Sequence, residues 1–359
     1  MKTKAINIFK LFLVFAVSAL TLASCGQPKE NPEQVIQKFK EQVTQINSGD
    51  ITTDVAMNGS DTQDTMDFTA NVNVKFDRRD EEDRKAEVKG TIGGMMKTAD
   101  KSIDGDLDFS LRTINDDYFL RVDKLDTSSE DFKVIQPQLK GYMGKWLKIA
   151  SDFIPQNLRQ LQQKDEATLA KEKQLKELFI NTPIFNVTKE YGVESVNGKK
   201  VYHYGVQLNA DGVKEYIRKA AVIDGRELTD AEVEEASKIV AYVNSAELWI
   251  GVKDYYLYKA TVGMSGEAGE GKPNMNVTIS MQGTDYNNTI DIKSPEDAQE
   301  FNPLELLMLY SAASTTATEP ADDTVTEEVP TGETATDTAT TEPVTEEPAT
   351  DTTTEQPAE

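Results

Sequence analysis

The feature that most constrains the fold is a strict alternation of apolar and polar residues over long stretches of the chain. Between positions 66 and 76, Met, Phe, Ala, Val, Val and Phe occupy every second position, and Asp, Thr, Asn, Asn and Lys lie between them. Because successive side chains of a strand point to opposite faces, this spacing predicts a β-strand with one apolar and one polar face. A sheet of such strands needs a cover over its apolar face.

Further strands follow in antiparallel order. The Asn197-Gly198 dipeptide suits a type I′ turn and predicts a hairpin between strands 186–196 and 199–208. Alternation at Leu107, Phe109 and Leu111 predicts a strand before an Asn115-Asp116 turn. Other strands are expected at these positions: 145–149, 246–252, 256–264, 275–281 and 289–293.

Amphipathic helices provide the cover that the strands require. Asn31 and Pro32 predict a helix start, and an apolar stripe continues to Ile46, with Gly49 as the end signal. A helical segment is expected over about 155–179, and Thr229 with Glu232 forms a capping box for a helix that runs through Val243. A short apolar segment at 304–310 is expected to be buried as a possible plug.

The N-terminus has the three-part plan of an export signal. Lysines at positions 2, 4 and 10 precede an apolar run, which ends in Leu22-Ala23-Ser24-Cys25. This tetrapeptide resembles the lipobox of bacterial lipoproteins, in which the cysteine is acylated after the signal is removed. We therefore expect Cys25 to carry acyl chains that anchor the protein in a bilayer outside the cytoplasm. A plain secretion signal with an incidental cysteine is the alternative.

The charge and its distribution limit the partners. The formal net charge is −24, which disfavours nucleic acid or an anionic bilayer as an electrostatic partner. Positions 26–310 hold 35 Lys and Arg against 49 Asp and Glu, a net charge of −14. The Thr-, Glu- and Pro-rich end is too poor in apolar residues to fold. We expect a signal peptide at 1–25, a linker at 26–30, one folded domain at 31–312 and a disordered acidic tail at 313–359.

No constellation of catalytic residues is evident. The chain has one cysteine and one histidine, His203, which lies within a predicted strand and beside no nucleophile motif. The Asp104-Gly-Asp-Leu-Asp108 run lacks the central glycine and the final glutamate of a calcium loop. The sequence therefore favours a protein without enzymatic activity, cofactor or resident metal.

Taken together, these features resemble the LolA/LolB-like lipoprotein fold and, within it, the LppX/LprG-type bacterial lipoproteins. The matching segments are the helix after the lipobox, the meandering strands, 191–204, 246–250 and 290–298. The resemblance implies an α+β fold with a strongly curved antiparallel sheet, a half-barrel whose concave face is covered by helices. It also implies a non-catalytic protein of the cell envelope that binds or carries a lipid or glycolipid in an apolar cavity.

Methionines and aromatic residues in the strands suit either a packed core or a cavity for flexible acyl chains. The residues expected to face the covered side and the ligand are Phe68, Val72, Trp249, Tyr258, Met264 and Met281. The alternative function is an envelope protein for structural or interaction purposes, with a packed interior and no ligand.

Overall fold

The computed structural model describes residues 30–60, 64–80, 82–98, 101–129, 136–154, 166–267, 274–302 and 304. All of these belong to one unit of the chain, Met1–Ala317. The expected signal peptide, Cys25, most of the linker, most of the 304–310 segment and the acidic tail lie outside the described residues.

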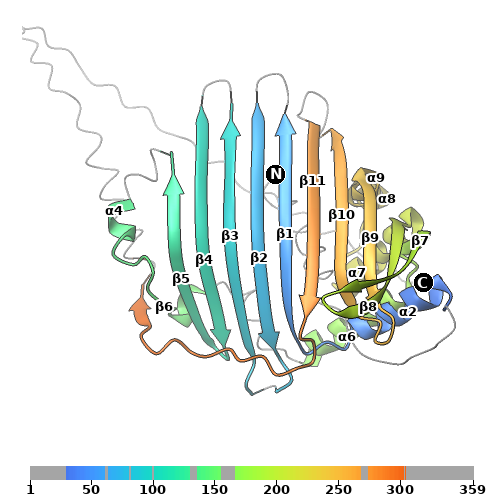
Figure 1. Cartoon of the computed structure of the whole chain (residues 1–359), viewed down its shortest axis with the longest axis horizontal. Coiled ribbons are helices and arrows are strands. Elements are labelled where there is room, and N and C mark those ends of the chain that lie inside the picture. Colours follow the sequence, from blue (N-terminus) through green and yellow to red (C-terminus); the bar gives the residue numbers. More distant parts are fainter. Residues whose placement is uncertain are drawn as a thin grey trace, which may run out of the picture. The chain divides into compact units, whose positions relative to one another are not determined.

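Twelve strands form one open sheet with the order β12-β6-β5-β4-β3-β2-β1-β11-β10-β9-β8-β7 (Figure 1). All neighbouring strands are antiparallel except β6 and β12, which are parallel. The sheet is curved and does not close, because its edge strands β12 and β7 lie at opposite ends of the order. The strand bounds are β1 (Ser48–Ser60), β2 (Thr65–Asp77), β3 (Lys85–Lys97), β4 (Ser102–Ile114), β5 (Asp117–Thr127), β6 (Leu147–Ile149), β7 (Phe185–Val196), β8 (Lys199–Leu208), β9 (Val243–Gly251), β10 (Leu257–Glu267), β11 (Asn274–Thr284) and β12 (Gln299–Phe301).

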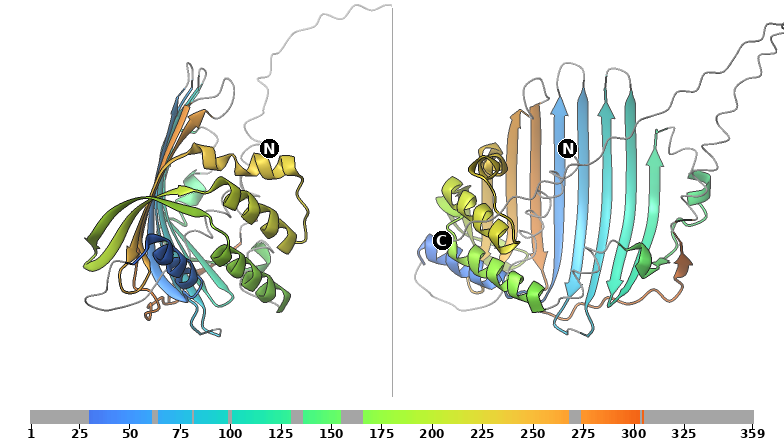
Figure 2. Two further views of the ribbon diagram at one scale, coloured as in Figure 1. Left: turned by 90° about the vertical axis from the view of Figure 1, so that its right-hand side faces the viewer. Right: turned by 180° about the vertical axis from the view of Figure 1, so that it is seen from behind.

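The larger helices lie on one face of the sheet, near its β7 end (Figure 2). We call this the inner face and the opposite one the outer face. The α+β half-barrel expected from the sequence is confirmed. Among the described residues, no helix is long and apolar enough to span a membrane. The helix bounds are α2 (Pro32–Val43), α4 (Gln136–Leu139), the 3₁₀ turn η1 (Ser151–Phe153), α6 (Glu166–Asn181), α7 (Ala210–Ile223), α8 (Asp230–Ser237) and α9 (Ile239–Tyr242).

Local sequence signals explain several boundaries. The side chain of Asn31 accepts a hydrogen bond from the Glu33 amide at 2.9 Å and caps α2, and Thr229 with Glu232 forms the expected capping box of α8. Asn197 and Gly198 have φ angles of 49° and 76°, as the expected type I′ hairpin requires.

Three of the expected elements differ in the structure. Helix α2 ends at Val43, and Gly49 belongs to β1, where a Cβ atom would lie 2.8 Å from the ring of Tyr286. The helix after Thr229 is divided into α8 and α9 at Lys238. The segment 289–293 is not a strand.

The packed core lies between the helices and the β7 end of the sheet. Val35, Ile36 and Phe39 of α2 belong to one buried cluster with Tyr204 of β8 and Ile250 of β9. Their side chains are at most 6 % exposed. Burial of such large apolar side chains contributes about 1.5–3 kcal/mol each, so this cluster holds α2 against the sheet.

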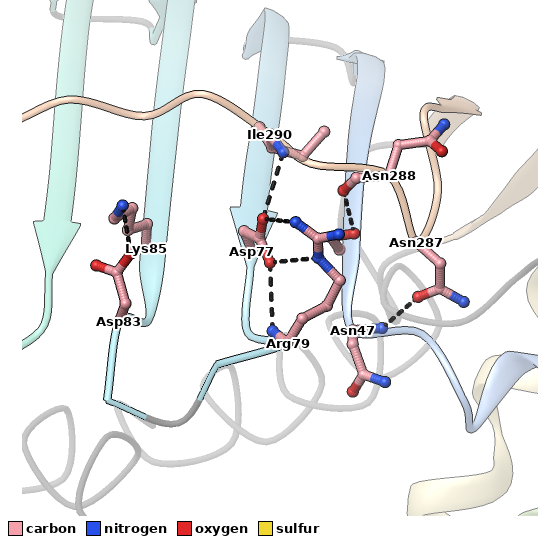
Figure 3. A network of polar contacts seen from close by, with 9 residues as sticks. Asn47, Asp77, Arg79, Asp83, Lys85, Asn287, Asn288 and Ile290 are labelled. Atoms are coloured by element: carbon pink, nitrogen blue, oxygen red, sulfur yellow. Dashed lines mark hydrogen bonds and ion pairs between the residues drawn. The ribbon is translucent and has the colours of Figure 1, made fainter.

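After β11 the chain returns across the ends of β1 to β5 and reaches β12 (Figure 1). Asp77 Oδ2 accepts a hydrogen bond from the Ile290 amide at 3.3 Å, and Ser48 Oγ donates to the Asn288 carbonyl at 2.6 Å. The side chain of Asn287 accepts from the Asn47 amide at 2.9 Å (Figure 3). These contacts fasten the returning segment to the strand ends.

Candidate functional site

The inner face of β1 to β5, β10 and β11 is apolar and uncharged. Strand pairing connects its residues in rows: Phe68 pairs with Met57, Met57 with Val277, and Val277 with Met264. On the other side of β2, Phe68 pairs with Gly94. Among the described residues in these rows, none is Asp, Glu, Lys, Arg or His. From position 66 to 76, at about 3.3 Å per residue, the face extends about 33 Å along the strands.

Most side chains of this face are only partly buried, although Ile51 and Phe76 at one end of it belong to the buried core. Phe68, Val72, Ile92, Leu107 and Phe109 are each of intermediate exposure, whereas the core against α2 is almost fully buried. Single exposed apolar residues are common, but a contiguous patch of several hundred Å² marks an interaction or ligand site. We call the apolar inner face of β1 to β5, β10 and β11 the ligand face.

Glycines of β3 provide room for aromatic rings on the ligand face. A Cβ atom at Gly90 would lie 2.3 Å from Cε1 of Phe109, and one at Gly94 would lie 3.4 Å from Cδ2 of Phe68. The two rings therefore lie close against the backbone of β3. These cross-strand contacts between an aromatic ring and a glycine shape the surface of the ligand face.

Methionines gather at the end of the ligand face formed by the tips of the hairpins. Met66 pairs with Met96 and, through Gly59, lies in the same row as Met275, while Met57 and Met264 lie in the next row. Half of the ten methionines of the chain are in these two rows. Flexible, polarizable methionines adapt to ligands of different shape. We call these five residues the methionine rim.

A small hollow of about 110 Å³ lies at the edge of the ligand face, between β5 and α4. Leu125 of β5 pairs with Leu107 and so belongs to the ligand face. Leu139 and Met143 supply the opposite wall. The hollow shows that α4 and the turn after it do not pack fully onto this edge.

Four of the six residues expected to face the ligand are brought together on this face. Phe68 and Met264 share one row. Val72 and Met281 share a second row through Thr53, four residues further along the strands. Phe68 and Met264 are three strand spacings apart, about 14 Å.

The fifth residue, Trp249, lies on the outer face, which corrects the expectation that it faces the covered side. It pairs with His203 and Lys259, whereas its neighbours Leu248 and Ile250 point to the inner face. Its ring stacks on the His203 ring at 4.1 Å, and Tyr191 stacks on the other side of His203 at 4.1 Å. Trp249 is therefore part of an aromatic stack on the outer face and does not line the ligand face.

Two carboxylates hold this aromatic stack together. Glu194 accepts hydrogen bonds from the Trp249 indole at 3.1 Å and contacts His203 Nδ1 at 2.8 Å. Glu247 accepts from the Tyr191 hydroxyl at 2.9 Å and contacts His203 Nε2 at 3.1 Å. The bonds from His203 and then Trp249 lower the pKa of Glu194. Both nitrogens of His203 are thus engaged with structural partners, which favours a role in joining β7, β8 and β9.

The sixth residue, Tyr258, lies at a β-bulge between Leu257 and Lys259. Its hydroxyl donates to Asp254 Oδ2 at 2.7 Å, and its ring makes edge contacts with Tyr256 and Tyr286. It is 4 % exposed. Tyr258 therefore belongs to a packed tyrosine cluster at the strand ends and not to the open ligand face.

The outer face is polar. A hollow of about 260 Å³ on this face is lined by Asp50, Thr52, Asn73, Asn197, Gln282 and Thr284. Asp106 of the Asp104-Gly-Asp-Leu-Asp108 run forms an ion pair with Lys124 at 2.8 Å. In the part of the chain that the structure describes, no group of three His, Cys, Asp or Glu residues could hold a metal ion.

Sequence reasoning missed much of the ligand face on β3 and β5. Ile92 and Met96 alternate correctly along β3, but Gly90, Gly93 and Gly94 interrupt the apolar pattern. The signal lies in the pairing of Gly90 with Phe109 of β4 and of Gly94 with Phe68 of β2.

Comparisons with known proteins give structural similarity alone. No family model and no curated protein sequence matches the chain. The lipoprotein LppX of Mycobacterium tuberculosis is similar over 74 % of this chain and 100 % of its own, with 11 % identity and a TM-score of 0.28. A DUF1329 family protein from Desulfovibrio piger is similar over 74 % of this chain and 96 % of its own, with 9 % identity and a TM-score of 0.18.

Proposed function

We propose that the chain is a lipid-anchored protein of the bacterial cell envelope that binds a lipid or another apolar ligand against the ligand face. It acts outside the cytoplasm as a binding or carrier protein, and Cys25 is its acylation site. The observation that carries this proposal is the uncharged, partly buried apolar face across seven strands.

The chemistry of the ligand follows from the lining. A face without charged groups binds through apolar contact, which contributes about 0.8 kcal/mol for each CH₂ group removed from water. The methionine rim and the extended rows through Phe68 and Val72 suit flexible acyl chains better than rigid or polar molecules. The residues proposed to contact the ligand are Phe68, Val72, Met264 and Met281.

Two neighbouring substitutions test this assignment. Phe68 points to the ligand face and the exposed Thr69 to the outer face, so Phe68→Glu and Thr69→Glu place the same charge on opposite sides of β2. Binding would be measured by titration with a fluorescent fatty acid, and folding by circular dichroism. We expect Phe68→Glu to weaken binding by at least about tenfold, because a charge buried against an acyl chain costs more than 1.4 kcal/mol.

Thr69→Glu is the matched control and is expected to bind as the natural chain does. Equal binding by both folded variants would contradict the assignment to the inner face. Absence of binding by the natural chain after removal of bound lipid would contradict the proposed function.

A further inference from the structure

The start of α2 is fastened to the turn between β9 and β10. Lys38 Nζ donates hydrogen bonds to Glu30 Oε2 at 2.8 Å and to the Tyr255 hydroxyl at 2.9 Å. The Tyr255 hydroxyl donates to Glu30 Oε1 at 2.8 Å. Lys38 also lies 4.5 Å from the centroid of the Tyr255 ring. The position at which the chain enters the folded body is therefore fixed.

Three exposed lysines lie beside this point of entry. The Lys200 carbonyl accepts a hydrogen bond from the Val252 amide at 3.0 Å, which joins the β7–β8 hairpin to the turn that carries Lys253. Lys199 lies close enough to Asp254 to lower its pKa, although burial of that carboxyl outweighs this effect. Lys199, Lys200 and Lys253 are exposed. We call these three residues together with Lys38 the anchor corner.

Nearby acids do not cancel the charge of Lys199, Lys200 and Lys253. Glu30 is bonded to Lys38, and Asp254 is 3 % exposed and bonded to Tyr258. The corner is therefore locally basic on a body whose residues 26–310 carry 35 Lys and Arg against 49 Asp and Glu. A basic area on an acidic protein fits an acidic partner surface.

The short segment between Cys25 and α2 would hold the folded body close to a bilayer, which is the acidic surface we consider. Cys25 precedes Glu30 by five residues, and a fully extended chain of this length spans at most about 18 Å. If Cys25 is held in a bilayer, Glu30 lies within about 18 Å of the lipid headgroups. The tether also allows closer approach. Because the Debye length at physiological salt is about 8 Å, lysines are attracted by anionic lipids once they lie within about that distance of the headgroups.

We propose that the anchor corner faces the bilayer that holds Cys25, and that Lys199, Lys200 and Lys253 contact its anionic phospholipid headgroups. The inference rests on the proposed acylation of Cys25. One consequence concerns the ligand face. The methionine rim lies at the opposite ends of the strands, and Met264 is six residues along β10 from Tyr258, about 20 Å. The open end of the ligand face therefore points away from the bilayer.

Chemical coupling allows a test that does not depend on natural acylation. Cys25 is the single cysteine of the chain, so the chain from Cys25 to Glu359 can be joined through it to a maleimide phospholipid in vesicles. Lysines would then be acetylated briefly with an amine-reactive ester and quantified by mass spectrometry. The vesicles would contain phosphatidylcholine alone or phosphatidylcholine with phosphatidylglycerol.

We expect labelling of Lys199, Lys200 and Lys253 to fall several-fold on vesicles with phosphatidylglycerol, and to recover in high salt. Labelling of the exposed Lys97 and Lys101, at the tip of the β3–β4 hairpin, should not change. Equal labelling of the corner on both vesicle types would overturn the proposal, as would stronger protection of Lys97 and Lys101.

Charge variants give a second readout. Replacing Lys199, Lys200 and Lys253 by Gln should abolish the phosphatidylglycerol-dependent protection of amides in the β9–β10 turn, measured by hydrogen exchange. The control replaces Lys97, Lys101 and Lys293 by Gln and should retain it. Because each lysine near an anionic surface changes binding by about fivefold, retention of this protection in the corner variant would overturn the proposal. Fatty-acid binding in solution is measured separately, so failure here is distinguishable from failure of the proposed function.

Discussion

The ring of Phe109 lies so close over Gly90 that a Cβ atom added there would be 2.3 Å from Cε1 of the ring. These two residues are directly paired across β4 and β3. Because Gly90 has no side chain, the Phe109 ring lies directly against the backbone of β3 on the ligand face. Glycine is needed at position 90 because a larger side chain would collide with the Phe109 ring, and not because of an unusual backbone conformation.

A double-mutant cycle tests this contact. Gly90→Ala is expected to destabilise the protein by about 1–3 kcal/mol, because the new methyl group displaces the Phe109 ring. In a Phe109→Ala background the same substitution should cost less than about 0.5 kcal/mol, since its clash is absent. Urea unfolding of the four proteins measures the coupling. Equal costs in both backgrounds would contradict the close contact.

Asp77 is expected to hold the returning segment at the strand ends. Arg79 donates to Asp77 at 2.9 and 2.6 Å, and the Ile290 amide donates at 3.3 Å. Asp77→Ala should reduce stability by about 1–3 kcal/mol, because the Ile290 amide loses its acceptor. Hydrogen exchange over residues 285–302 should become faster. Asp83→Ala, which removes a surface ion pair with Lys85 (Figure 3), is the control and should cost at most about 1 kcal/mol.

The aromatic stack predicts a loss of stability in acid. The hydrogen bonds from His203 and then Trp249 hold the pKa of Glu194 below its ordinary value of 4.5. A carboxyl with a lowered pKa in the folded state stabilises that state above 4.5, and this contribution disappears as the pH falls below 4.5 toward the folded-state pKa.

We therefore expect Glu194→Gln to show a weaker dependence of the urea midpoint on acid pH than the natural chain. The fluorescence of Trp249 in a Trp146→Phe background reports on the stack directly. An unchanged pH dependence in Glu194→Gln would show that Glu194 does not stabilise the stack.

Asp254 should have the opposite pH dependence. Burial raises its pKa above the ordinary value of 3.8, although the hydrogen bond from Tyr258 opposes this. The contribution of Asp254 to stability is therefore present below pH 3.8 and is lost as the pH rises through the folded-state pKa. Asp254→Asn should match the stability of the natural chain in acid and exceed it at neutral pH. A natural chain that is the more stable at neutral pH would contradict this account.

The local pattern of the sequence predicted several strands, such as those at 66–76 and 186–196, and the turn at Asn197-Gly198, because these depend on neighbouring residues. It did not predict β1 or β3, in which glycines and polar residues interrupt the alternation. It could not predict that β1 pairs with β11, since this contact joins distant segments and depends on the whole sheet. Trp249 was misplaced because Leu248, Trp249 and Ile250 are apolar in succession, which hides the alternation. The bulge at Tyr258 similarly changes the phase of β10 by one residue.

The measurement that tests the central claim most directly is organic extraction and mass spectrometry of the Cys25→Ser chain, purified from a secreting bacterial host. We predict a lipid with acyl chains at close to one molecule per chain, and its loss in Phe68→Glu but not in Thr69→Glu. A native mass equal to that of the bare protein, together with no uptake of added lipid, would contradict the ligand face and favour a packed envelope protein without a ligand.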